Sequence, residues 1–243
     1  MRQKKIHYIY NDAMECMDFD ERKKLQGERL RATVELEYNN VPAYRKRMDE
    51  AGVKPEDING IEDIVKLPFT QKTDLRDNFP YGLFAADLKD IVRIQGSSGT
   101  TGKPIVSGYT ENDIKVWTEM VARALTAAGG TKDDIIQIAY GYGLFTGGLG
   151  AHQGATEIGA TVIPMSSGNT QRQIIMMKEL GATMLCCTPS YATYLAETIH
   201  EMGIKPEELK LKSGCFGAEP WTEEMSQHLK ETFVLTFESF CPY

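Results

Sequence analysis

The stretch ATMLCCTPSYATYLAETIHEMG, residues 182–203, contains one complete change from strand to helix. Its first seven residues form a short, mainly apolar run, which is typical of a buried strand. The amphipathic segment that follows, about 190–202, ends at Gly203, and a glycine just past a helix accepts the left-handed cap conformation. The stretch therefore predicts a strand–helix unit, with Ser190 as the residue that caps the helix.

The same alternation extends through the chain from residue 91 onward. Short apolar runs predict strands at 91–94, 135–140, 160–165, 182–188 and 213–218. Amphipathic segments predict helices at about 111–128, 148–158, 170–180, 190–202 and 222–231. Strand–helix alternation implies a parallel sheet with helices on its faces. We therefore predict an α/β fold with ligands bound at the carboxyl ends of the strands.

The first 90 residues have a different pattern. Leu30, Val34 and Tyr38 are four apart with charged residues between them, which predicts helix over 20–50. The helix should be interrupted at Val41, because a residue that precedes proline avoids the helical region. We predict two parts: residues 1–90 as a helical and connecting layer, and residues 91–243 as the α/β core.

Composition limits the classes of function. Hydrophobic residues make up 42% of the chain, charged residues 25%, and the formal net charge is −7. This acidic balance argues against a nucleic acid or an anionic membrane as partner, and no apolar run approaches the ~20 residues that span a bilayer. The chain has five cysteines, an odd number without paired spacing, and it has no recognisable signal peptide; both features favour a cytoplasmic protein. Scattered histidines give a protein-ligated metal site little support.

The segment QGSSGTTGKP, residues 95–104, follows the first predicted strand directly. Its glycines let backbone N–H groups approach an anion closely, while hydroxyl groups and Lys103 add donors and positive charge. The Walker P-loop pattern does not fit, because Ser97 stands at its first glycine and Pro104 follows the lysine. The composition favours a phosphate-binding loop, and the alternative is a flexible surface turn.

Two further turns follow predicted strands. The turn AYGYGLFTGGLG, residues 139–150, combines three aromatic residues with five glycines, which suits a flat apolar ligand; the alternative is a packed turn with core aromatics. The turn GAEPW, residues 217–221, follows the last predicted strand. Its alternative is a plain strand-to-helix connection, with Glu219 facing the positive end of the helix that follows.

Together these motifs resemble those of the adenylate-forming enzymes, and most closely the phenylacetate–CoA ligases. The similarity rests on SSGTTGKP (97–104), on the aromatic turn with His152-Gln153-Gly154, and on GAEPW. Supporting stretches lie at 67–86, 166–174 and 188–197, so the resemblance covers about residues 20–230. It implies an α/β fold with a parallel sheet flanked by helices, forming an incomplete N-terminal domain of an adenylate-forming enzyme.

The resemblance also implies an activity: a carboxylic acid and ATP form an acyl-adenylate, which CoA converts to a thioester. ATP, Mg²⁺ and CoA would then be needed, with phenylacetate or another aryl acid as substrate. Thr100 or Thr101 would lie near Mg²⁺, since hard cations prefer oxygen ligands. The implied nucleotide-binding residues are Ser97, Ser98, Gly99, Thr100, Thr101, Gly102, Lys103, Ala218, Glu219 and Pro220. The implied substrate-binding residues are Tyr140, Gly143, Phe145 and Gly217.

The sequence departs from the family after GAEPW. The family's Tyr-Gly-x-[ST]-Glu motif is absent, and its catalytic lysine would lie beyond the end of this chain, so no catalytic residue is assigned. We expect the chain by itself to form no acyl-CoA. Two alternatives stay open: a non-catalytic nucleotide-binding or inert fragment, and adenylation of an indole or hydroxyaryl carboxylate. The resemblance also leaves a homodimer open.

Overall fold

The structure, a computed structural model, describes residues 8–97 and 105–233. It divides into two compact units. The first comprises residues 12–114, and the second begins at Lys115 and includes the residues before Asp12. The boundary at residue 91 proposed from the sequence falls inside the first unit.

The first unit is built around a long helix, α2 (Phe19–Asn40). Val41 ends it and Pro42 begins α3 (Pro42–Glu50), as the sequence predicts. The buried core of the first unit is formed by Val34, Met48 and Ile58. The remaining short helices are α1 (Asp12–Glu15), η1 (Pro55–Asp57), η2 (Ile61–Lys66), α4 (Lys72–Asp77) and η3 (Leu88–Asp90).

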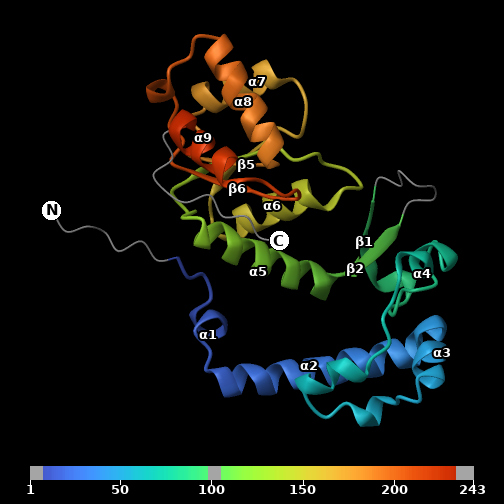
Figure 1. Cartoon of the computed structure of the whole chain (residues 1–243). Helices are drawn as coiled ribbons and strands as arrows, with labels where there is room; N and C mark the ends of the chain where they lie inside the picture. Colours follow the sequence, from blue (N-terminus) through green and yellow to red (C-terminus); the bar gives the residue numbers. More distant parts are fainter. Residues whose placement is uncertain (1–7, 98–104, 234–243) are drawn as a thin grey trace. The chain divides into compact units, whose positions relative to one another are not determined.

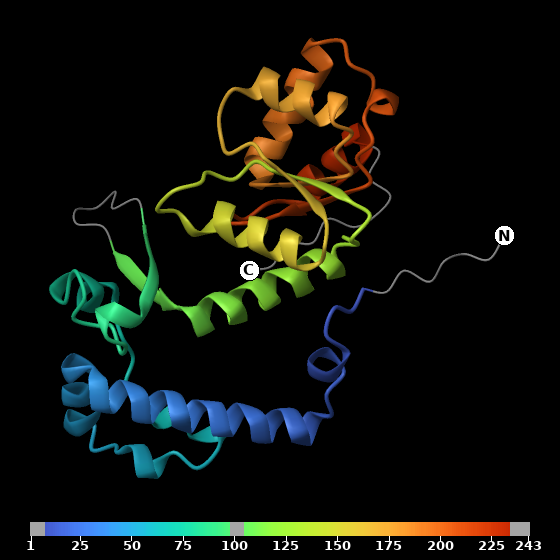
Figure 2. The same ribbon diagram turned by 180° about the vertical axis from the view of Figure 1, so that it is seen from behind.

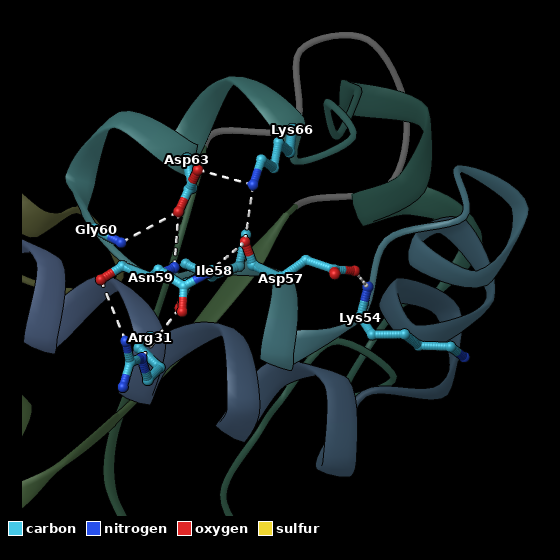
Figure 3. A network of polar contacts seen from close by, with 8 residues as sticks. All are labelled: Arg31, Lys54, Asp57, Ile58, Asn59, Gly60, Asp63 and Lys66. Atoms are coloured by element: carbon cyan, nitrogen blue, oxygen red, sulfur yellow. Dashed lines mark hydrogen bonds and ion pairs between the residues drawn. The ribbon is translucent and has the colours of Figure 1, made fainter.

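A polar network holds the segment 58–63 against α2 (Figure 3). The Arg31 guanidinium donates to the carbonyl oxygens of Ile58 and Asn59, at 3.0 and 3.1 Å. The Asp63 carboxylate accepts from the backbone N–H groups of Asn59 and Gly60, at 2.7 and 3.2 Å. These bonds satisfy backbone groups of a segment that forms no strand or long helix.

Strands β1 (Ile91–Gly96) and β2 (Val106–Thr110) pair with each other in antiparallel fashion. They form a separate two-stranded sheet within the first unit. The prediction that residues 91–94 belong to the parallel sheet is therefore wrong. The physical reason is chain length: fewer than the dozen or so residues needed for a parallel crossover separate the two strands.

The second unit contains a four-stranded parallel sheet in the order β4-β3-β5-β6. Its strands are β3 (Ile135–Ile138), β4 (Thr161–Pro164), β5 (Met184–Cys187) and β6 (Ser213–Phe216). Ile136 pairs with Val162 on one side and with Met184 on the other, and Met184 pairs with Ser213. The predicted α/β fold with a parallel sheet is confirmed.

Helices cover both faces of this sheet (Figures 1 and 2). One face carries α5 (Glu111–Ala127) and α6 (Thr146–Glu157), and its core includes Leu125, Ile136, Ala155 and Met184. The other face carries α7 (Thr170–Glu179), α8 (Pro189–Glu201) and α9 (Glu223–Phe233). Its core includes Ile174, Leu185, Leu195, Phe216 and Leu229. Helices therefore cover both faces of the sheet, as parallel sheets require, although Thr161 and Pro164 of the edge strand β4 are exposed.

The residues that cap the helices agree with the sequence predictions at all but one position. Thr110 and Asp113 form a reciprocal capping pair, with the Thr110 N–H 2.8 Å from the Asp113 carboxylate. The predicted terminal glycines all adopt positive φ: Gly129, Gly159, Gly181 and Gly203. The prediction that Ser190 caps α8 is wrong, because Thr188 accepts the bond from the Tyr191 N–H. Across the described ranges, no helix has the length and apolar character to cross a bilayer.

Candidate functional site

Three loops meet at the carboxyl end of the parallel sheet. Tyr140 follows β3, and its hydroxyl donates to the carbonyl oxygen of Cys187, the last residue of β5, at 2.6 Å. The Ser190 N–H, after β5, donates to the Glu219 carboxylate, after β6, at 2.7 Å. The loops that the sequence singled out after β3, β5 and β6 are therefore joined directly.

A cavity of about 240 Å³ lies beneath these loops, on the face of the sheet covered by α5 and α6. None of its lining residues carries a charged side chain. The helices contribute Trp117, Val121, Leu125, Gly150 and Ala151, and the strands contribute Cys186, Cys215 and Phe216. An apolar cavity at this edge suits an uncharged, ring-sized group.

Two aromatic rings from the turn after β3 line the cavity. Tyr140 is half-buried, while Phe145, the N-cap residue of α6, is half-exposed. Gly147 separates them: a Cβ added there would lie 3.3 Å from the Phe145 ring and 3.5 Å from the Tyr140 ring. A side chain at this position would therefore press on the Phe145 ring and contact the Tyr140 ring, whereas glycine leaves that space open.

Trp117 of α5 is a lining residue that the sequence did not single out. A Cβ added at Gly150 of α6 would lie 2.7 Å from its indole ring, and one at Gly154 would lie 2.5 Å from Val121. The two glycines are four apart, so they share one face of α6 and let α5 approach. This glycine spacing is a signal in the sequence that could have indicated a close helix contact here, and it was not used to predict one.

The turn after β6 contributes Gly217 and Ala218 to the cavity. Ala218 has φ +75°, a left-handed conformation that a residue with a Cβ rarely adopts. The next residue, Glu219, binds at the amino end of α8, and the hydrogen bond from Ser190 holds the pKa of its carboxyl below the usual value. The alternative interpretation, which placed Glu219 at the start of the helix that follows it, is wrong, because α9 begins only at Glu223.

Hydrogen bonds outside the cavity fix the aromatic turn. The Tyr142 hydroxyl lies 3.1 Å from Nδ1 of His152 on α6, and the Tyr142 N–H donates to the Ser166 hydroxyl at 3.3 Å. Burial raises the pKa of Tyr142 to about 12, and burial also raises the pKa of Tyr140. Both phenols are therefore neutral near pH 7, and Tyr140 lines the cavity while it donates a hydrogen bond to Cys187.

The predicted nucleotide-binding and substrate-binding residues divide into three groups. Tyr140, Phe145, Gly217 and Ala218 line one cavity, whereas Gly143, Glu219 and Pro220 do not line it. Residues 98–104, with the proposed phosphate and metal ligands, lie outside the described residues. Ser97, in the first unit, closes the base of that loop: its N–H donates to the Ile105 carbonyl at 2.9 Å, and its hydroxyl accepts from the Ile105 N–H at 3.3 Å.

Metal-binding side chains do not gather in the described part of the chain. Within residues 8–97 and 105–233, no three His, Cys, Asp or Glu side chains lie close enough to hold an ion together. The proposed metal ligands Thr100 and Thr101 fall outside these ranges.

Comparison with known sequences gives close relatives. The phenylacetate–coenzyme A ligase of Pseudomonas putida is 50% identical over 220 residues, which are 90% of this chain and 50% of that enzyme. The phenylacetate–coenzyme A ligase of Thermus thermophilus is 48% identical over 223 residues, or 92% of this chain and 50% of that enzyme. The chain thus spans about half the length of the curated relatives it matches. No protein-family model matches it.

Comparison with solved structures supports the same similarity. A 2-hydroxyisobutyryl-CoA ligase, solved with 2-HIB-AMP and CoA in its thioesterification state, superposes with a TM-score of 0.89 at 26% identity. The match covers 97% of this chain and 52% of that one. The same ligase in an open conformation gives a TM-score of 0.88 at 25% identity, over 97% and 56% of the two chains. The fold is that of about half of an adenylate-forming CoA ligase.

Proposed function

We propose that this chain, 48–50% identical to phenylacetate–coenzyme A ligases over about nine tenths of its length, carries the acid-binding part of such a ligase. The proposed activity of the whole protein is ATP-dependent activation of an aryl acid to an acyl-adenylate, followed by transfer of the acyl group to CoA. The observation that carries the proposal is the uncharged cavity bounded by Tyr140 and Phe145 at the carboxyl end of the sheet.

The uncharged lining of the cavity determines whether the aryl ring or the carboxylate of the acid enters it. No cationic side chain lines it, so burial of a carboxylate there would be costly. The aryl ring would therefore enter between the Tyr140 and Phe145 rings, and the carboxylate would stay at the mouth, beside the loops after β5 and β6. This orientation presents the carboxylate for activation while water is excluded from the ring.

The loop of residues 97–103 is the proposed binding site for the leaving pyrophosphate. Its backbone N–H groups, its hydroxyls and Lys103 would stabilise the negative charge that develops there. The residues also suit Mg²⁺, whose preferred ligands are oxygens such as those of Thr100 and Thr101. Mg²⁺ would neutralise phosphate charge when it is bound with ATP.

Titration calorimetry of this chain tests the acid site. We expect saturable binding of phenylacetate and much weaker binding of acetate, which lacks the ring, because each missing methylene-sized group costs about 1–3 kcal/mol in an apolar pocket. A long-chain fatty acid should also bind weakly, because its chain exceeds a cavity of about 240 Å³. Phe145→Ala should weaken phenylacetate binding, whereas Tyr194→Ala, an exposed aromatic residue on α8, serves as the matched control. Equal affinity for acetate and phenylacetate would refute the proposal that the substrate is an aryl acid. Tighter binding of an indole carboxylate than of phenylacetate would make the indole acid the proposed substrate.

A second titration tests the phosphate loop. Thr101→Ala combined with Lys103→Ala should weaken MgATP binding at least tenfold, since one charge-assisted hydrogen bond contributes about 1.5–3 kcal/mol. Lys89→Ala, which removes an exposed lysine of the first unit, is the control. Unchanged MgATP affinity in the double variant would exclude this loop. Binding of both ligands without thioester formation from added CoA would identify the chain as a binding part of the ligase.

A further inference from the structure

Two cysteines meet inside the apolar cavity. Cys186 of β5 and Cys215 of β6 are direct partners in the register of neighbouring parallel strands. Register partners of this kind project from the same face of a sheet, and both residues line the cavity between the sheet and α5 and α6. Neither forms a disulfide. The end of the cavity formed by the sheet therefore carries two adjacent free thiols.

The two thiols interact directly and unequally. The interaction between the two thiols raises the pKa of Cys186 and lowers that of Cys215. Cys186 is 1% exposed, whereas Cys215 is only partly buried. Cys215 is thus the more accessible of the two thiols.

The residues around the two thiols favour a ligand that bonds to both sulfurs and to no other side chain. Among the described residues, no group of three or more His, Cys, Asp or Glu side chains could complete a metal site, and zinc ordinarily takes four ligands. The walls beside the thiols are apolar: Trp117, Val121, Leu125 and Phe216. A suitable ligand therefore has a soft atom that bonds to both sulfurs and an uncharged ring that enters the cavity.

We propose that Cys186 and Cys215 form a paired-thiol site for arylarsenic(III) compounds. Both thiols add to an arylarsenic(III) oxide: two arsenic–sulfur bonds form, the arsenic–oxygen bond breaks, and the two thiol protons leave with that oxygen as one water. No oxidant or reductant is needed, because arsenic stays trivalent. The third arsenic bond holds the aryl ring, which takes the place proposed above for the ring of the acid.

The site rests on the cavity and the two thiols, and needs neither ATP nor CoA. Its location nevertheless bears on the proposed function, because an occupied ring site should exclude phenylacetate. Protection by phenylacetate would tie the two sites together. Adduct formation without such protection would leave the thiol site in place and count against the acid site, so the two proposals fail separately.

The test uses the full chain with Cys16→Ser and Cys241→Ser, which removes an exposed cysteine and one outside the described residues. Phenylarsine oxide is added at one equivalent in the presence of a monothiol, and intact mass is measured. We expect one added aryl-arsenic group, released by a dithiol but not by the monothiol. Cys215→Ser should abolish the adduct. Cys187→Ala should retain it, because Cys187 projects into the core on the opposite face of the sheet.

Peptide mapping gives a second readout that needs no variant in the site. Lys210 and Lys212 lie between the two cysteines, so trypsin separates them into different peptides. An arsenic bridge should join these two peptides into one species. The proposal is overturned if the parent chain gains no adduct, if the bridge involves Cys187, or if folded Cys215→Ser or Cys215→Ala chain still forms a dithiol-reversible adduct.

Discussion

Asp134 connects the amino ends of three strands of the parallel sheet, and its replacement by alanine should destabilise the second unit. The residue precedes β3 and is 2% exposed. Its carboxylate accepts from the N–H and hydroxyl of Thr131, both at 2.8 Å, and from the Thr183 hydroxyl before β5, at 2.7 Å. The Lys212 ammonium, before β6, lies 2.8 Å away.

The size of the effect follows from these contacts. A hydrogen bond to a charged group contributes about 1.5–3 kcal/mol, and donors left without an acceptor add a penalty. Two contacts reduce the loss: the Thr183 hydroxyl also reaches the Ile135 carbonyl at 3.3 Å, and the Lys212 side chain is 38% exposed and can return to water. We therefore expect Asp134→Ala to lower the free energy of unfolding by about 3 kcal/mol.

Urea unfolding, followed by tryptophan fluorescence and circular dichroism, measures this difference. Asp133→Ala is the matched control, because its neighbouring carboxylate is exposed and should change stability by less than about 0.5 kcal/mol. If Asp134→Ala also stays within that limit, the carboxylate does not hold the strands together. A similar loss in both variants would refute the reasoning as well.

The same carboxylate predicts a pH dependence. Burial raises the pKa of Asp134, but hydrogen bonds from Lys212, Thr183 and Thr131 outweigh burial, so the pKa lies below its ordinary value of 3.8. Stability from a group with a lowered pKa is complete above the unfolded value and is lost as pH falls through the folded value. The difference between the parent chain and Asp134→Ala should therefore be constant near neutrality and shrink below about pH 4.

Three further outcomes are expected. Gly154→Ala should lower stability by about 1–3 kcal/mol in thermal unfolding, because its Cβ would lie 2.5 Å from Val121; adding Val121→Ala should restore part of the loss, and no change in Gly154→Ala would contradict close packing of α5 and α6. Tyr140→Phe should cost about 1 kcal/mol through the lost bond to Cys187, yet keep phenylacetate affinity within about threefold by calorimetry; a larger loss of affinity would mean that the hydroxyl itself binds the acid. Glu219→Gln should lower the free energy of unfolding by about 0.5–1 kcal/mol near pH 7, because it removes a negative charge at the amino end of α8. This loss should vanish as pH falls through the lowered pKa of the Glu219 carboxyl, and a loss that persists in acid would show that the charge is not its cause.

Local sequence predicted most elements because their signals act over a few residues. The strands β3 to β6 and the helices α5 to α9 lie within a few residues of the predicted ranges. Val41 before Pro42, the Thr110–Asp113 cap and Gly203 each acted through backbone geometry that neighbouring residues settle. The aromatic turn after β3 was found for the same reason, because its composition differs from that of its surroundings.

Pairing between distant segments was decided by the tertiary structure. Nothing in residues 91–94 distinguishes a parallel from an antiparallel strand, and only the pairing with 106–110 settled it. Glu219 binds the amino end of α8 rather than the helix that follows it, because the order of the strands places those loops side by side.

The residues that line the cavity also divide into those predicted from the sequence and those found only in the tertiary structure. The resemblance of sequence motifs predicted Tyr140, Phe145 and Gly217 as substrate-binding residues, and the structure places all three in the lining of one cavity. Trp117 and the pair Cys186 and Cys215 carry no such local mark. Their roles arise because the parallel register aligns β5 with β6 and because small residues on α6 let α5 approach, and both depend on contacts far apart in the chain.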